Sequence, residues 1–193
     1  MRTSEQGTTM ETGTGGAAWT LFPTAIGACG LSWRETTLLG VHLPERDPAA
    51  TAARLTRRWA GARRAEPGEA LARLIERLTA HLAGQCDDFT DVPLPLERVA
   101  PFEREVYAIT RAIPAGRTRT YGEVARQLGD VALARAVGQA LGHNPWPLVV
   151  PCHRVIAAQG APGGFSGGEG TPTKLRILAI EGVLPGGQPS LFE

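Results

Sequence analysis

The sequence NPWPLVVPCHRVI, residues 144–156, is the most informative part of this chain of 193 residues. Its prolines cannot extend a helix, so any helix before it must end near its first residue. The apolar run at 148–150 predicts a short buried segment, and Cys152 follows it with His153 beside it. A cysteine with an ionisable neighbour is a candidate nucleophile. The dipeptide alone is more typical of a small core residue, because a lone cysteine in an apolar setting usually packs there.

Two short helices are expected upstream of this stretch, at 121–128 and 131–141, with a tight Gly-Asp turn between them. Two short helices across a glycine turn are typical of a helix-turn-helix, here about 121–141, although a plain helical hairpin has the same pattern. A longer helix precedes them. Its apolar residues keep helical spacing from Phe102 until the Pro-Ala-Gly sequence at 114–116 stops it.

The first half of the chain predicts a mixture of strands and helices. Between 19 and about 41, short apolar stretches separated by glycine and polar residues favour β-strands and turns. A helix is expected over 47–59, where an Asp-Pro pair supplies the cap and the first helical residue. A second helix is expected over 67–82, with leucine and isoleucine on one face. No catalytic motif is evident in this half.

The Pro-rich sequence at 92–96 fits neither a central strand nor a helix, so we expect an edge strand or the entry to a linker. The predicted fold class is α+β. An N-terminal α+β domain with a short sheet spans 17–97, and a mainly helical C-terminal domain with the helix-turn-helix spans 98–193. Residues 1–16 are polar and rich in Thr and Gly, which predicts a disordered tail rather than a targeting segment.

Composition is that of a globular protein, and the charge is distributed unevenly along the chain. Hydrophobic residues make up 42% of the chain and charged residues 20%, and no run is long enough to predict a membrane-spanning helix. The net charge of +1 hides a basic middle part: residues 98–154 carry eight Arg and four acidic residues, a net charge of +4. Because the planar fork of Arg binds two phosphate oxygens, this excess indicates a small nucleic-acid footprint without establishing one.

The three cysteines, Cys29, Cys86 and Cys152, form no CxxC pair and leave one residue over. This argues against a disulfide framework and fits a reducing compartment, so an intracellular, cytoplasmic protein is expected. His42 and His81 accompany two of the cysteines in the first half, which leaves a zinc site conceivable. Since their spacing is not that of metal ligands, four unrelated side chains are the simpler interpretation, and no metal or cofactor is expected in the chemistry.

Several further strings accompany the cysteine motif in a fixed order. Together they resemble the O6-alkylguanine-DNA alkyltransferase family, also called methylated-DNA–protein-cysteine methyltransferase. The likeness covers about 98–183, whereas the first half resembles the family only in kind. The strings that carry it are IPAG at 113–116, TYGEVA at 120–125, RAVG at 135–138, NP at 144–145, PCHRV at 151–155, GFSGG at 164–168, Lys174, and EG at 181–182.

The resemblance implies a set of catalytic residues. Cys152 would be the nucleophile, His153 its general base acting through a water molecule, and Glu181 the group that orients the imidazole, as in a hydrolytic triad used once. Tyr121 would rotate the target nucleotide and donate a proton to the departing guanine. Asn144 would be the hinge that joins the helix-turn-helix to the active-site segment.

The resemblance also implies how DNA and the damaged base are held. Arg135 would enter the duplex where the base has flipped out, and the small residues Ala134 and Ala136 would let the helix approach the minor groove. The partner would be double-stranded DNA containing O6-alkylguanine, bound by a monomer. The base pocket would be formed by Ser166, Phe165, the Val155 carbonyl, Pro147 and Trp146, although the last two also fit ordinary packing.

Three departures from the family's pattern lie outside the proposed triad. Phe165 stands where many relatives have Tyr, the segment 167–173 is slightly longer than usual, and Tyr107 stands where Trp is common. The longer segment would change the width of the pocket and so the range of alkyl groups accepted. The Tyr107 change is interpreted as a packing exchange.

Three other functions compete with single-turnover alkyl transfer. A sensor that flips alkylguanine without transferring the alkyl group would resemble this chain, but such relatives lack the cysteine, so Cys152 favours transfer. A helix-turn-helix transcription factor leaves the cysteine motif unexplained. A cysteine hydrolase would require turnover of an ester or a peptide.

Overall fold

The N-terminal half is built on a four-stranded sheet of strand order β3-β2-β1-β4. β1 (Ala18–Thr24), β2 (Gly27–Arg34) and β3 (Thr37–His42) form an antiparallel meander, and the two-residue β4 (Arg63–Arg64) runs parallel to β1. The expected strands between 19 and 41 are therefore confirmed, whereas β4 was not predicted. The computed structural model describes residues 16–183, so the tail predicted at 1–16 lies outside the described residues except for Gly16.

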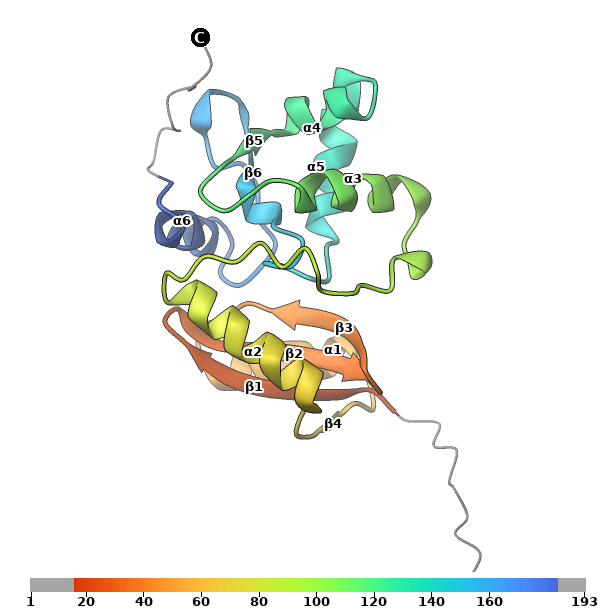
Figure 1. Cartoon of the computed structure of the whole chain (residues 1–193), viewed down its shortest axis with the longest axis vertical. Coiled ribbons are helices and arrows are strands. Elements are labelled where there is room, and N and C mark those ends of the chain that lie inside the picture. Colours follow the sequence, from red (N-terminus) through yellow and green to blue (C-terminus); the bar gives the residue numbers. More distant parts are fainter. Residues whose placement is uncertain (1–15, 184–193) are drawn as a thin grey trace, which may run out of the picture.

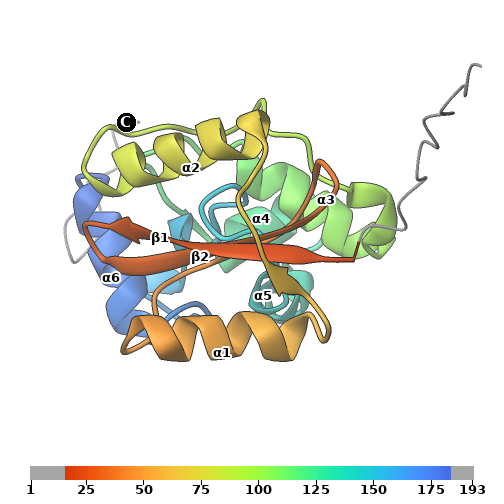
Figure 2. The ribbon, with the colours of Figure 1, turned by 90° about the horizontal axis from the view of Figure 1, so that it is seen from below.

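Two helices cover opposite faces of this sheet, α1 (Pro48–Arg58) and α2 (Glu69–Leu82) (Figure 2). The Asp47 side chain accepts a hydrogen bond of 2.7 Å from Ala50 N, which is the cap expected from the Asp-Pro pair. α2 begins two residues later than predicted, because Gly68 is its N-cap residue. Its buried face consists of Leu71, Leu74, Leu78, His81 and Leu82.

The connection between the two halves is a linker without a strand. The sequence at 92–96 leads into the short 3-10 helix η1 (Leu96–Arg98), so the edge strand considered for it is not formed. Nη2 of Arg111 on α3 (Pro101–Arg111) donates hydrogen bonds to three carbonyls of the preceding segment, at 2.9–3.0 Å. These bonds hold the linker against α3.

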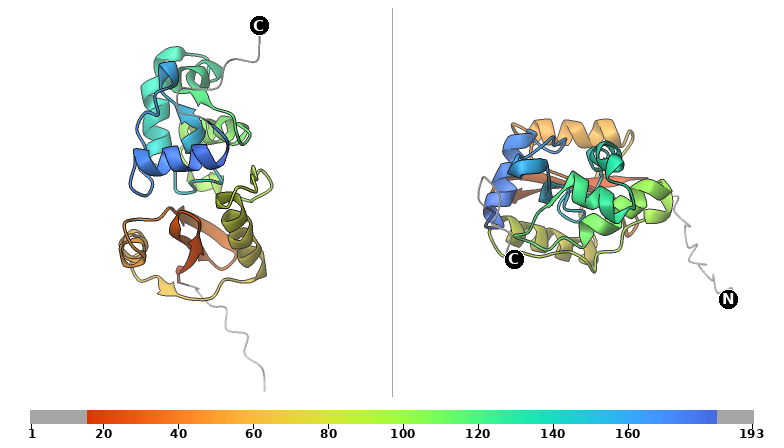
Figure 3. Two further views of the ribbon diagram at one scale, coloured as in Figure 1. Left: turned by 90° about the vertical axis from the view of Figure 1, so that its left-hand side faces the viewer. Right: turned by 90° about the horizontal axis from the view of Figure 1, so that it is seen from above.

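The helix-turn-helix pattern is present in the second half. α4 (Tyr121–Gln127) begins with a capping box between Thr120 and Glu123, and the 3-10 helix η2 (Val131–Leu133) leads into α5 (Ala134–Gly142). Gly129 in the turn has φ of +99°, a conformation that favours glycine. Figures 1 and 3 show this helical half stacked on the sheet of the first half, in agreement with the predicted α+β class.

The remaining elements surround the cysteine motif. Cys152 begins the 3-10 helix η3 (Cys152–Arg154), which continues into β6 (Val155–Ile156). β6 pairs in parallel with β5 (Arg119–Thr120), and this small second sheet was not predicted. The 3-10 helix η4 (Ala158–Gly160) and α6 (Thr171–Ile180) follow. No helix among residues 16–183 is long and apolar enough to cross a bilayer.

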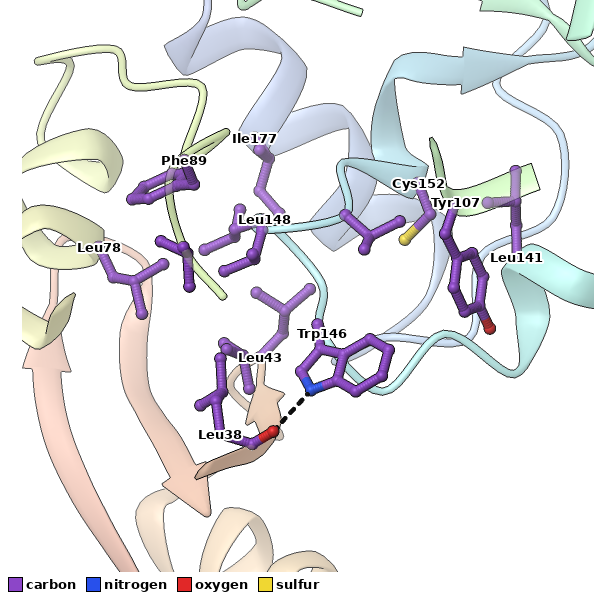
Figure 4. Packing of buried hydrophobic residues seen from close by; sticks show 14 of the residues in the cluster. Leu38, Leu43, Leu78, Phe89, Tyr107, Leu141, Trp146, Leu148, Cys152 and Ile177 are labelled. Atoms are coloured by element: carbon purple, nitrogen blue, oxygen red, sulfur yellow. Dashed lines mark hydrogen bonds between the residues drawn. The ribbon is translucent and has the colours of Figure 1, made fainter. Parts of the chain in front are cut away.

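Strand β3 contacts the segment that precedes Cys152. Val41 N donates to Pro145 O at 2.9 Å, and Trp146 Nε1 donates to Leu38 O at 3.2 Å (Figure 4). At Gly40 a Cβ atom would lie 3.1 Å from Pro145 O, so glycine permits the close approach. Buried residues from both halves form one hydrophobic cluster around this contact. A domain boundary near residue 97 therefore remains a prediction.

Candidate active site

Cys152 is buried in the wall between two cavities. One opens toward α4 and α5, has a volume of about 670 Å³, and is lined in part by Tyr121, Arg135 and Phe165. This volume lies within the usual range for a bound small organic group, about 300–1,000 Å³. The other cavity lies toward the N-terminal half and is lined in part by His42, Arg54, Arg58, Asn144 and Pro147. Cys152 thus lines a cavity on the side of the helix-turn-helix.

The environment of Cys152 contains opposing influences on its pKa. Burial raises the pKa of the thiol, while a hydrogen bond from Asn144 and the nearby charge of Lys174 act to lower it. Asn144 is itself fixed, because Nδ2 donates to Val150 O at 2.8 Å and Oδ1 accepts from Trp146 N at 2.9 Å. Asn144 therefore joins the end of α5 to the segment that carries the cysteine.

His153 and Glu181 form a fully buried pair beside the cysteine. Nε2 of His153 lies 3.0 Å from Oε1 of Glu181. Burial lowers the pKa of His153, so the imidazole is neutral at neutral pH and donates its Nε2–H to the carboxylate. Its Nδ1 is buried and has no hydrogen-bond partner among the described residues. This nitrogen therefore presents a free lone pair, as a general base requires.

Arg154 and His81 also contact Glu181. Nη2 of Arg154 lies 2.8 Å from Oε1 and Nε lies 3.1 Å from Oε2, and Nε2 of His81 lies 3.1 Å from Oε1. Burial would raise the pKa of Glu181, but hydrogen bonds from His153 and Arg154 and the close approach of His81 hold it far below its usual range. Arg154 also donates to Asp88 Oδ1 at 2.9 Å and to Ile113 O at 2.6 Å. Roles for Arg154 and His81 were not predicted, since their partners come from distant segments.

Tyr121 lies at the start of α4 and faces the larger cavity. Its hydroxyl donates to Gly164 O at 3.2 Å, and burial raises its pKa, so the phenol keeps its proton at neutral pH. A Cβ atom at Gly163 would lie 2.9 Å from the Tyr121 ring, so glycine lets the loop cross the ring closely. The predicted proton donor is therefore held at the mouth of the cavity.

Lys174 is a buried cation whose role was not predicted, although it belongs to the quoted motif. Its Nζ donates to Val155 O at 2.6 Å and lies 5.7 Å and 5.8 Å from the ring centroids of Tyr121 and Phe165. Burial lowers its pKa to about 8. The Val155 carbonyl, which the resemblance assigns to the base pocket, is thus already engaged by Lys174.

Three of the four predicted DNA-contacting residues lie on α5, and the fourth, Tyr121, begins α4. Ala134 and Arg135 line the larger cavity, and Ala136 is next to them in sequence. Arg135 is exposed and forms no ion pair or hydrogen bond within residues 16–183. Its guanidinium is therefore available for an external partner.

The predicted pocket residues divide into three groups, of which Pro147 lines only the cavity toward the N-terminal half. Phe165 and Ser166 line both cavities, and the Ser166 hydroxyl donates to Gly142 O at 2.8 Å. Arg54 of α1 holds the same loop from the other side, since its Nη2 donates to Ser166 O at 2.9 Å. By contrast, Trp146 and Val155 line neither cavity. Trp146 packs edge-on against Tyr107 with ring centroids 6.2 Å apart.

The side chains considered for a zinc site do not come together in the described part of the chain. Cys29 is buried beside Thr24, Cys86 is exposed, and His42 lines the cavity next to Cys152. His81 instead belongs to a buried group with His153 and Glu181, whose potential ligand atoms lie within 4.8 Å of one another.

The amino-acid sequence of this chain is similar to a family model and to several known proteins. Residues 101–183 match a family model described as 6-O-methylguanine DNA methyltransferase, DNA binding domain. A methylated-DNA–protein-cysteine methyltransferase of Mycolicibacterium paratuberculosis is 47% identical over 116 residues, which are 60% of this chain and 68% of that protein. A DNA base-flipping protein of Thermus thermophilus is 42% identical over 134 residues, which are 64% of this chain and 88% of that protein.

The fold is also similar to solved structures over both halves. A crystal structure of Mycobacterium tuberculosis OGT in complex with DNA matches with a TM-score of 0.69 and 32% identity. The match covers 86% of this chain and 93% of that one. The likeness thus includes the N-terminal sheet as well as the part that carries the motifs.

Proposed function

Because this chain belongs to the methylated-DNA–protein-cysteine methyltransferase family, we propose that it repairs DNA by moving an alkyl group from O6 of guanine to Sγ of Cys152. The observation that carries the proposal is the buried His153–Glu181 pair at 3.0 Å, next to a cysteine in the wall of a cavity beside the helix-turn-helix. The reaction occurs once per molecule, since the thioether that forms is not reversed.

The first step is activation of the thiol. The proton of Cys152 passes to the free Nδ1 of His153, with a water molecule as the relay, and Glu181 stabilises the resulting imidazolium. The charge of Lys174 and the hydrogen bond from Asn144 favour the thiolate, opposing the effect of burial.

The second step is transfer. The thiolate attacks the alkyl carbon in line, a C–S bond forms, and the bond from that carbon to O6 breaks with its electron pair on guanine. Tyr121 gives its phenolic proton to the guanine ring, so the leaving group departs neutral. A backbone N–H of the loop around Ser166 hydrogen-bonds O6 and stabilises the charge that develops there.

DNA binding precedes both steps. The exposed Arg135 enters the duplex in place of the flipped nucleotide, and Ala134 and Ala136 let α5 lie close to the minor groove. The protein acts as a monomer on double-stranded DNA, and this contact reads backbone and shape rather than base edges.

A non-catalytic sensor of alkylated DNA is the second candidate, favoured by the likeness to a DNA base-flipping protein. The two functions separate in one experiment. The protein is incubated with a duplex that contains one O6-methylguanine, and its intact mass is recorded. A gain of one methyl group per molecule supports transfer. Tight binding of the lesion without a mass change identifies a sensor, and neither binding nor transfer rejects both.

A further inference from the structure

His81 belongs to the N-terminal half, yet its side chain reaches the carboxylate of the proposed triad. It lies near the end of α2 and is fully buried. Its Nε2 lies 3.1 Å from Oε1 of Glu181, and Nε2 of His153 lies 3.0 Å from the same oxygen. The carboxylate therefore stands between two imidazoles, one from each half of the chain.

The position of the proton on His81 follows from its other nitrogen. Asp87 N donates a hydrogen bond of 3.0 Å to Nδ1, so Nδ1 carries a lone pair and a neutral ring has its proton on Nε2. That N–H faces Glu181, although it lies off the line of an ideal hydrogen bond. Phe89 packs edge-on against the ring at 5.3 Å between centroids and limits its rotation.

We propose that His81 is a positioning residue for the catalytic base: it donates from Nε2 to Glu181 and fixes the carboxylate that orients His153. This inference rests on the proposed function. It means that the base of the C-terminal half is completed by a donor from α2.

A metal ion is a poor alternative occupant of this group. The potential ligand atoms of His81, His153 and Glu181 are close together, but Nη2 of Arg154 lies 2.8 Å from the same Oε1. A cation bound there would meet a guanidinium at contact distance, inside a fully buried cluster of side chains. His153 and Arg154 hydrogen-bond this oxygen and His81 Nε2 lies 3.1 Å from it, an arrangement that suits a carboxylate anion rather than a metal ion.

Loss of the His81 donor would change both the position and the charge of Glu181. The carboxylate would be free to move toward Arg154, and alignment of His153 would be lost. Glu181 would also keep more negative charge for its bond to His153, which favours the imidazolium. The first change lowers the rate at which Cys152 reacts, and the second moves the acid limb of its pH profile to higher pH.

Two amide substitutions test separately the two contacts of the His81 ring, that of Nε2 with Glu181 and that of Nδ1 with Asp87 N. His81→Gln places an N–H near the position of Nε2, and so keeps the donor to Glu181. His81→Asn places its amide near the position of Nδ1, and so keeps only the partner of Asp87 N. Leu82→Ala, at the adjacent buried position of α2, is the control for a loss of packing.

Two rates are measured on the full-length variants as a function of pH: methyl transfer from an O6-methylguanine duplex, and carbamidomethylation of Cys152 by iodoacetamide, mapped by peptide mass. For His81→Asn we expect both rates to fall on the order of 10-fold, the effect of losing one hydrogen bond to an ionised group. We also expect the acid limb of the pH profile of His81→Asn to move to higher pH. His81→Gln should stay close to wild type, and Leu82→Ala should melt at a lower temperature with an unchanged pH profile.

The inference is overturned if His81→Asn keeps the wild-type rate and profile, or if Leu82→Ala reproduces its effect on both. Failure of the proposed function gives a different result. In that case wild-type protein takes no methyl group from DNA, while the iodoacetamide rate at Cys152 still reports whether His81 acts on the base.

Discussion

The two halves of this chain contribute to the candidate active site in different ways. The C-terminal half supplies the groups that would touch the reacting atoms, namely Cys152, His153 and Tyr121, within short recognisable strings. The N-terminal half contains no such string. It nevertheless contacts groups of the other half around the site, for example through Leu38 O to Trp146, Arg54 to Ser166 O, and His81 to Glu181.

This difference teaches that reactive groups and their support have different sequence signatures. A nucleophile and its base need particular residue types at fixed spacing, so they can be found from local sequence. A supporting contact often needs only a donor of suitable length facing a carbonyl or carboxylate. Many residues satisfy this requirement, and the partner lies far away in the sequence.

Glu181→Gln should have the largest effect, because it removes the negative charge that His81 of one half and His153 and Arg154 of the other half contact. Arg154 would keep a buried guanidinium with only Asp88 as an anionic partner, and breaking a buried ion pair costs about 3–5 kcal/mol. We expect the free energy of unfolding in urea to fall by this amount, and methyl transfer to slow on the order of 100-fold or more. If the variant has the wild-type free energy of unfolding, the contacts of Glu181 do not stabilise the association of the two halves.

Tyr121→Phe tests a contribution of the C-terminal half alone. The phenol is the proposed proton donor, and its only hydrogen bond among the described residues is to Gly164 O. We expect the single-turnover rate to fall by about 100-fold, the effect of losing a general acid, with little change in melting temperature. An unchanged rate would assign Tyr121 to binding or packing.

The pH dependence of transfer tests the protonation state of His153. Burial lowers its pKa, so it binds a proton only below the ordinary histidine value of about 6.5. We expect the transfer rate to stay constant as the pH falls from about 7.5 to 6.5. At lower pH, binding of one proton by His153 should lower the rate, with a limiting slope of about tenfold per pH unit. A decline that begins above the ordinary histidine value would contradict a buried neutral base.

Arg54→Met tests the smallest contribution, that of α1 to the loop over the cavity. The substitution removes the bond to Ser166 O at 2.9 Å and the ion pair with Glu45, while much of the aliphatic stem is kept. We expect a several-fold loss in transfer rate, of the size of one modest hydrogen bond of about 1 kcal/mol. Arg57→Met is the matched control on the same helix, since Arg57 is exposed and contacts no loop residue through a hydrogen bond in the described part. If the two variants transfer the methyl group at equal rates, the contact of Arg54 with the loop does not contribute to the reaction.

Much of the fold could be predicted because it is encoded locally. The Asp47 cap, the apolar face of α2 and the Gly129 turn are each formed within a few residues. The two-residue strands β4 and β5 could not be predicted in this way. They exist only because a distant strand, β1 or β6, lies beside them.

The same physical reason limits prediction of the site. Proximity of Cys152 to His153 follows from adjacency, and Glu181 was reached through the resemblance to a family. Arg154 carries no local sign that it pairs with Glu181 and Asp88, because these partners lie 27 and 66 residues away. His81, placed among leucines on the buried face of a helix, has the pattern of an ordinary core histidine.

The most direct test of the central claim is to find which atom of the protein carries the methyl group after reaction. Wild-type and Cys152→Ala proteins are incubated with the O6-methylguanine duplex, digested and fragmented in a mass spectrometer. The account predicts one methyl group on Sγ of Cys152 in the wild type and none in the variant. A methyl group on Cys29 or Cys86, or continued methylation of the Cys152→Ala protein, would contradict it.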